Sequence, residues 1–288
     1  MPVREKNSEQ NQINSKNTSF WDELCGSLLA KQLGIKSHDA QSLRKFDNAY
    51  MAFYPYLDKH LNLGSLRKAK VLDIGLGYGT VGQKLAQSSK FYNGLDIARK
   101  PVEMMNNRMD TLQLNGKAIQ GSMLECPFPD EEFDRAFAIG CFHHTGNMQT
   151  CVNQAYRVLK PGGKAMIMVY NKFSFRHWTR WPITTLKNLL KQLLPNIFNT
   201  PDKASVRQRK SYDAAIDGEA APETEFFSVS DIKKIFKSYS DVHIERENCD
   251  GIHLPIIKNL RIVIKREWLL SSWFTRLLGL DLYIVATK

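Results

Sequence analysis

The chain has 288 residues, of which 43% are hydrophobic and 24% charged, and its formal net charge is +11 at pH 7. This composition excludes a disordered chain and predicts one globular core domain with insertions. The five cysteines form no C-x-x-C pair, which disfavours a disulfide framework or a zinc site, so we expect no metal. Free thiols, no stretch of roughly 20 apolar residues and no signal-peptide pattern predict a cytoplasmic protein.

The N-terminal part is predicted to hold a polar tail and a helical cap. Residues 1–17 are polar and are expected to be a disordered tail. Apolar residues recur at helical spacing across residues 18–66, which predicts the cap. Tyr50 and Tyr54 lie four positions apart and share a helix face. They are candidate substrate contacts, although such stripes are more often only core.

The segment VLDIGLGYGT at 71–80 is the most informative part of the chain. Its apolar residues predict a buried parallel strand. Gly75, Gly77 and Gly79 then allow a sharp turn with no Cβ between the backbone and a ligand. A helix is expected from Thr80. This order of strand, glycine turn and helix is typical of a nucleotide-like ligand site.

The glycine spacing and Asp73 distinguish this site from a dinucleotide site. The third glycine falls one position earlier than in G-x-G-x-x-G. Asp73 would repel a pyrophosphate but attract an ammonium group. A second predicted strand, 91–97, ends at Asp96, where an acidic side chain accepts hydrogen bonds from ribose hydroxyls. The alternative is two surface aspartates beside a tight turn.

Four blocks between Lys70 and Tyr170 together resemble the class I S-adenosylmethionine-dependent methyltransferases. They are VLDIGLGYGT, GLDIARK, GSMLECPFPDEEFDRAFAIGCFHHT and YRVLKPGGKAMIMVY. The resemblance implies an α/β, Rossmann-like sheet of seven mostly parallel strands, with its S-adenosylmethionine-binding core at 67–170. It implies cofactor contacts at Asp73, Gly75, Gly77, Gly79, Thr80, Asp96, Ile97, Ser122, Met123 and Gly140. Ser122 stands where family members often have an acidic residue.

Residues 171–230 are predicted to be a substrate-cap insertion after the fifth strand. Between 171 and 210 there are nine basic residues and one acid, Asp202. We expect Phe173 and Trp178 to enclose an apolar part of an acceptor, and Arg176 or Arg180 to meet an anionic part. A solvated helix face and a membrane-surface patch are the alternatives. Nucleic acid is disfavoured, because no RNA-binding module is recognisable.

The C-terminal part, 231–288, is expected to return to the core with the last two strands of the sheet, 241–249 and 280–288. A helix with Ser230 as its N-cap precedes them, and a basic, apolar helix at 265–279 lies between them. The pattern YD…GEAAPETEF at 212–226 resembles bacterial methyltransferases of natural-product and surface-saccharide pathways.

The predicted function is methyl transfer from S-adenosylmethionine to a small-molecule acceptor, with S-adenosylhomocysteine as product. A hydroxyl acceptor needs a base, for which His143, His144 and Glu219 are candidates. The first alternative is a lipophilic, membrane-held acceptor such as a quinone or lipid precursor. An RNA methyltransferase, an aminopropyl transferase and a non-catalytic cofactor-binding protein are further alternatives, and the oligomeric state stays open.

Overall fold

One seven-stranded sheet forms the centre of the molecule. The computed structural model describes residues 3–24, 27–35, 39–194, 203–215, 218–257 and 260–288. The strand order is β3-β2-β1-β4-β5-β9-β6, with bounds β1 Lys70–Ile74, β2 Phe91–Asp96, β3 Gly116–Gln120, β4 Phe133–Ile139, β5 Leu159–Tyr170, β6 Asp241–Glu247 and β9 Asp281–Thr287. The first five strands pair in parallel, and β9 runs antiparallel to β5 and β6. The expected α/β, Rossmann-like fold class is confirmed.

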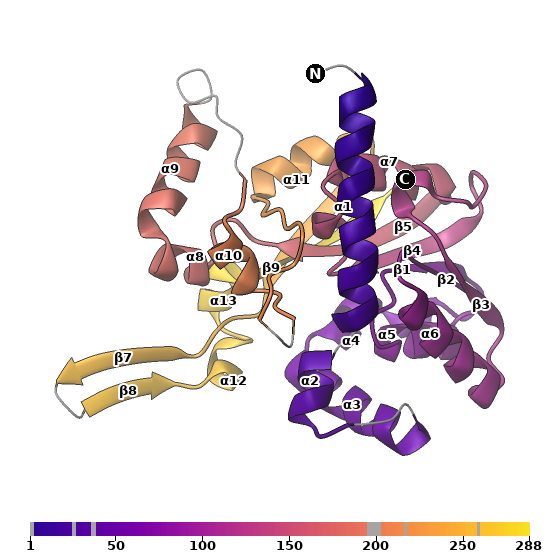
Figure 1. Cartoon of the computed structure of the whole chain (residues 1–288), viewed down its shortest axis with the longest axis horizontal. Coiled ribbons are helices and arrows are strands. Elements are labelled where there is room, and N and C mark those ends of the chain that lie inside the picture. The colour runs from indigo at the N-terminus through magenta and orange to yellow at the C-terminus, as the bar shows by residue number, and fades with distance from the viewer. Residues whose placement is uncertain (1–2, 25–26, 36–38, 195–202, 216–217, 258–259) are drawn as a thin grey trace.

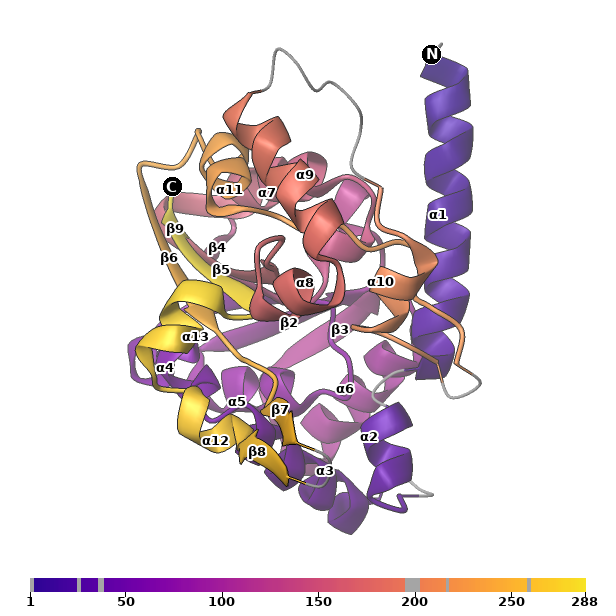
Figure 2. The same ribbon diagram turned by 90° about the vertical axis from the view of Figure 1, so that its left-hand side faces the viewer.

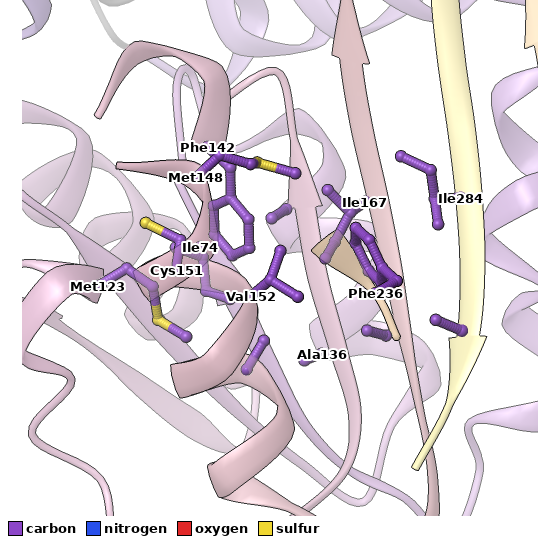
Figure 3. Close-up of a cluster of buried hydrophobic side chains, with 14 of the residues drawn as sticks. Ile74, Met123, Ala136, Phe142, Met148, Cys151, Val152, Ile167, Phe236 and Ile284 are labelled. Carbon is purple, nitrogen blue, oxygen red and sulfur yellow. The ribbon is translucent and has the colours of Figure 1, made fainter. Parts of the chain in front are cut away.

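Helices cover both faces of the sheet (Figure 1). On one face, α4 (Leu57–Leu61), α5 (Thr80–Ser88) and α6 (Arg99–Leu112) bury their apolar sides against β1 and β2. On the other face, α7 (Met148–Val158) and α11 (Val229–Ile235) bury theirs. Figure 3 shows Cys151 and Val152 of α7 packed against strand residues such as Ile167. Burial on both faces explains the continuous apolar runs in the central strands.

The N-terminal segment differs from the sequence prediction. The structure has a single helix, α1 (Val3–Leu24), where a disordered tail was expected through residue 17. Tertiary contacts that no sequence pattern reveals account for the difference. The Asn17 side-chain amide donates to the His144 carbonyl at 2.6 Å, and the Gln10 amide donates to the Thr145 carbonyl at 2.8 Å. The cap continues with α2 (Ser27–Gln32) and α3 (Ala40–Phe53).

Within the described residues, the insertion and the C-terminal part contain six helices and a hairpin, besides the sheet strands β6 and β9. The insertion forms α8 (Phe175–Arg180), α9 (Pro182–Leu193) and α10 (Val206–Lys210). The hairpin of β7 (Ile252–Ile257) and β8 (Leu260–Ile264) was not predicted. The predicted helix at 265–279 is two helices, α12 (Arg266–Leu269) and α13 (Trp273–Leu278). The described part of the chain also has three one-turn 3₁₀ helices: η1 (Leu63–Ser65), η2 (Met123–Glu125) and η3 (Phe142–His144).

The N-cap of α11 is Ser228, two residues before the predicted Ser230. The Ser228 hydroxyl accepts from the Asp231 N–H, and the Asp231 carboxylate accepts from the Ser228 N–H. This reciprocal capping box requires a side chain that can accept a hydrogen bond three residues after the cap. Ser228 has Asp231 there, whereas Ser230 has Lys233. Within the described parts of the chain, no helix is both long and apolar enough to span a bilayer.

Candidate functional site

Two adjoining cavities lie at the carboxyl ends of the central strands, the usual ligand edge of such sheets. The first has a volume of about 180 Å³ and is lined by the ends of β1, β2 and β4 and by one face of α1. The second has a volume of about 510 Å³ and lies between the glycine turn, α3 and the segment after α10. Trp21, Gly75, Gly77 and Ile139 line both cavities. A ligand in the first cavity is therefore next to a ligand in the second.

The glycine turn forms the wall between the two cavities. Gly75 and Gly77 have φ of +78° and +51°, which is the left-handed region that favours glycine. A Cβ on Gly75 would lie 2.6 Å from the Cys141 Cβ, so packing requires glycine there. A Cβ on Gly77 would meet no atom within 4 Å. Gly77 therefore presents bare backbone to open space, as a ligand cradle does.

Asp96 closes the first cavity at the end of β2. Its carboxylate accepts from the backbone N–H of Leu76 at 2.7 Å and of Ala98 at 2.8 Å. The backbone of Gly77 also hydrogen-bonds to this carboxylate. A carboxylate has about four acceptor sites, so the three backbone groups leave about one for a ligand. Burial raises the pKa of Asp96 to about 6. The other predicted contacts in this cavity are Ile97, Ser122, Met123 and Gly140.

Asp73 lies at the base of the second cavity. It is 3% exposed and accepts a hydrogen bond from the Tyr92 hydroxyl at 2.8 Å. Burial raises the pKa of Asp73 to about 7. A cationic ligand group nearby would favour the carboxylate form. Thr80 also lines this cavity, whereas Gly79 is the N-cap of α5 and lines neither.

Tyrosines and carboxyl groups dominate the polar lining of the second cavity. Tyr50 of α3 and Tyr54, the C-cap of α3, line this cavity, and Tyr212 and Asp213 come from the segment after α10. Among the described residues that line this cavity there is no lysine, arginine or histidine. Its electrostatics therefore suit a neutral or cationic molecule better than an anion.

His144 and Asp213 meet where the two cavities adjoin. The Nδ1 of His144 lies 2.7 Å from the Glu223 carbonyl, which can only accept, so Nδ1 carries the proton and Nε2 has the lone pair. That Nε2 lies 3.5 Å from Oδ2 of Asp213, which accepts from the Tyr170 hydroxyl at 2.9 Å. Burial raises the pKa of Asp213 and lowers the pKa of His144. The pair is suited to exchange one proton.

The other two candidate bases lie away from the cavities. His143 is fully buried, its ring centroid is 4.1 Å from that of Tyr170, and it lines neither cavity. Burial holds the pKa of His143 well below its usual value, so it is neutral. Glu219 is exposed and also lines neither cavity. The geometry thus brings only His144 of the three to the site.

The aromatic and basic candidates of the insertion lie outside both linings. Arg176 is paired with Asp250, at 2.7 and 2.6 Å, instead of pointing at a ligand. Its guanidinium lies 4.4 Å from the centre of the Tyr212 ring, so it supports a lining residue from behind. Arg180 is exposed, and the rings of Phe173 and Trp178 stack on each other at 6.5 Å. For Arg176, the partner is a carboxylate 74 residues away in sequence, which the sequence pattern does not reveal.

Sequence reasoning missed three residues of the site. Trp21 lines both cavities, and its ring lies 4.7 Å from the His144 ring. Tyr212 and Asp213 belong to the YD…GEAAPETEF pattern, but nothing in that pattern indicates that the YD pair faces the glycine turn. Helical apolar spacing was visible around Trp21, but it does not tell a core residue from a cavity wall.

Comparison with known proteins supports a methyltransferase domain. Residues 71–163 match the family described as methyltransferase domain. A demethylmenaquinone methyltransferase of Tropheryma whipplei is 29% identical over 136 residues, 47% of this chain and 54% of the relative. The 27-O-demethylrifamycin SV methyltransferase of Amycolatopsis mediterranei is 32% identical over 98 residues, 33% of this chain and 36% of the relative. A sterol 24-C-methyltransferase of Gibberella zeae is 31% identical over 121 residues, 41% and 31% of the two chains.

The first of these matches spans about half the length of the relative, and the others about a third. The domain match confirms the expectation of an S-adenosylmethionine-dependent methyltransferase domain. The acceptors in the names of these relatives belong to the relatives and do not identify the acceptor of this chain.

Solved structures share the fold. A putative methyltransferase from Bacillus halodurans C-125 superposes with a TM-score of 0.52 at 16% identity, covering 81% of this chain and 98% of that one. The [4+2]-cyclase SpnF superposes with a TM-score of 0.50 at 12% identity, covering 85% of this chain and 81% of the cyclase chain. Since a cyclase shares it, this fold alone does not decide the reaction.

Proposed function

We propose that the chain transfers the methyl group of S-adenosylmethionine to a small-molecule acceptor held in the second cavity. The observation that carries the proposal is the wall of four residues, Trp21, Gly75, Gly77 and Ile139, shared by the two cavities. A cofactor along the glycine turn and an acceptor beside Tyr50 and Tyr54 would be neighbours across that wall. Alignment of this kind accounts for much of the rate of bimolecular enzyme reactions.

The residues present fit the cofactor. The open space at Gly77 and the remaining acceptor site of the Asp96 carboxylate suit a ligand with ribose hydroxyls at the first cavity. Asp73 suits the ammonium group of the methionine end. When bound, S-adenosylmethionine supplies an electrophilic methyl group on a sulfonium. Asp96, Ile97, Ser122 and Met123 would hold its adenosine end.

His144 and Asp213 would accept the proton that a hydroxyl acceptor loses. They are positioned by the Glu223 carbonyl and the Tyr170 hydroxyl. Trp21, whose ring lies against that of His144, would exclude water from the junction. Tyr50 and Tyr54 would contact the acceptor, and burial raises the pKa of both, so they remain hydroxyl donors at neutral pH.

The acceptor is proposed to be an uncharged, largely apolar molecule with a hydroxyl group, of a natural-product or related biosynthetic pathway. The lining without a basic side chain supports a neutral molecule over a phosphate or carboxylate. A second candidate is a membrane-held quinone or lipid precursor. The aromatic lining and the exposed apolar surface described below favour it.

Activity profiling tests the proposal. The full chain is incubated with methyl-labelled S-adenosylmethionine and fractionated extracts, and labelled products are identified by mass. Paired acceptors that differ only by a phosphate group test the charge preference. Label in the neutral member alone is expected, and preference for the phosphorylated member would contradict the proposed acceptor class.

A further inference from the structure

Helix α9 exposes a stripe of large apolar side chains to solvent. The exposed fractions are 71% for Ile183, 49% for Leu186 and 64% for Leu193, and Leu190 between them is 37% exposed. At about 3.6 residues per turn these positions share one side of the helix. Thr185, which is 1% exposed, lies on the opposite side and faces the molecule. The apolar side of this amphipathic helix thus points outward, the reverse of an ordinary surface helix.

Basic residues accompany the stripe. Pro182–Leu193 contains no aspartate or glutamate. Lys187 and Lys191 follow the stripe along one edge, each one position after an exposed leucine. An outward apolar face with lysines at its margin is typical of helices that lie in the interface of a lipid bilayer.

Two exposed tryptophans lie on the same side of the molecule. Trp268 of α12 is 69% exposed and Trp273 of α13 is 74% exposed. Helix α8 connects them with α9, because it packs on α9 and its Phe175 ring lies 5.0 Å from Phe274 of α13. Figure 2 looks directly at α8, α9, α12 and α13, which all face the viewer. Tryptophan is enriched where proteins meet the headgroup region of a membrane.

We propose that Ile183, Leu186, Leu190 and Leu193, together with Trp268 and Trp273, form a docking surface for an anionic lipid bilayer. The apolar side chains would enter the headgroup and upper acyl region. Lys187, Lys265 and Arg276, all exposed, would meet anionic headgroups, against a single exposed acid, Glu267, on α12. This surface faces away from the β2–β3 edge of the sheet, at the left of Figure 1.

The surface is connected to the second cavity through α8. Arg176 of α8 supports the ring of Tyr212, which lines that cavity. Docking would therefore bring the cavity close to a lipid surface. The inference does not depend on methyl transfer, since its test measures only binding to vesicles.

The test is flotation of the full chain with vesicles of phosphatidylcholine containing phosphatidylglycerol. The wild type should float with anionic vesicles, and less so with pure phosphatidylcholine or at high salt. The triple variant Ile183→Ser, Leu186→Ser, Leu193→Ser should bind at least about tenfold more weakly. The matched control is Leu112→Ser, since Leu112 is 43% exposed on α6, away from this surface. It should bind as the wild type does.

Calorimetric binding of S-adenosylmethionine and circular dichroism show whether the variants are folded. Trp273→Ser provides a second readout, because it should reduce the blue shift of tryptophan fluorescence on vesicle addition. Absence of flotation by the wild type, or equal flotation of the triple variant, would overturn the proposal. So would a wild-type dimer that the triple variant dissociates, because a second copy would then cover the surface.

Discussion

Arg108 and Asp47 join helix α3 to the glycine turn. Both terminal nitrogens of Arg108 donate to the Asp47 carboxylate at 2.8 Å, and its Nε donates to the Tyr78 carbonyl at 3.1 Å. Asp47 also accepts from the Thr80 hydroxyl at 2.7 Å. Helix α3, which carries Tyr50 and ends at the C-cap Tyr54, is thereby held against the turn that separates the two cavities.

Replacing Asp47 should destabilise the protein strongly. The Arg108 side chain is 2% exposed, so Asp47→Ala leaves a buried charge without its partner. We expect a loss of about 3 kcal/mol in the free energy of unfolding, measured with urea. The exposed pair of Arg99 and Glu103 is the control, and Glu103→Ala there should cost less than about 1 kcal/mol. Similar losses for both variants would contradict the structural role of the Asp47 pair.

Gly77→Val should abolish cofactor binding while the protein stays folded. The side chain would occupy the open space at the turn and strain a backbone with φ of +51°. Gly34→Val is the matched control, since Gly34 has φ of +66° and open space around it but lines neither cavity. Calorimetry with S-adenosylmethionine should show binding by the control only. Normal binding of S-adenosylmethionine by a folded Gly77→Val variant would show that the cofactor does not bind at the turn.

Affinity for S-adenosylmethionine should rise with pH up to about 7 and then level off. The pKa of Asp73, raised to about 7 by burial, means that its carboxylate forms only as the pH passes that value. A ligand with an ammonium group prefers the carboxylate, so its affinity should increase by up to about tenfold per pH unit below 7. Asp96 titrates near 6, so the Asp73 contribution is the difference between the wild type and Asp73→Asn. If the affinities of the wild type and of Asp73→Asn change with pH in parallel, Asp73 does not contribute to the pH dependence.

Asp213→Asn should lower kcat without weakening cofactor binding. The amide preserves the size of the side chain and an acceptor for the Tyr170 hydroxyl, but it cannot take up a proton. For a hydroxyl acceptor we expect a fall of about 100-fold or more. Glu219→Gln, an exposed change outside both cavities, should leave kcat unaltered. An unchanged kcat for Asp213→Asn would remove this residue from the reaction.

The sheet and the first cavity were predictable because their signals are local. The turn at Gly75 and Gly77 follows from glycines between an apolar run and a helix pattern. Asp96 follows from its place at the end of the next strand. Both features depend on a few adjacent residues, and the structure places both at the first cavity.

The second cavity was harder to predict because distant segments build it. Tyr50 and Asp213 are 163 residues apart and both line it. Arginine is a residue type that often binds anions, but the charge of Arg176 is paired with Asp250. Only the fold brings these two residues together. Likewise, residues 3–17 are helical because this part of α1 packs across the loop after His144.

Transfer of labelled methyl from S-adenosylmethionine, followed together with S-adenosylhomocysteine release, tests the central claim most directly. The account predicts one S-adenosylhomocysteine for each methylated acceptor with the wild type, and neither product with Gly77→Val. An acceptor that competes at the Tyr50 and Tyr54 cavity should also become labelled. Failure of the wild type to bind S-adenosylmethionine in calorimetry, or equal methyl transfer by the wild type and Gly77→Val, would contradict the account.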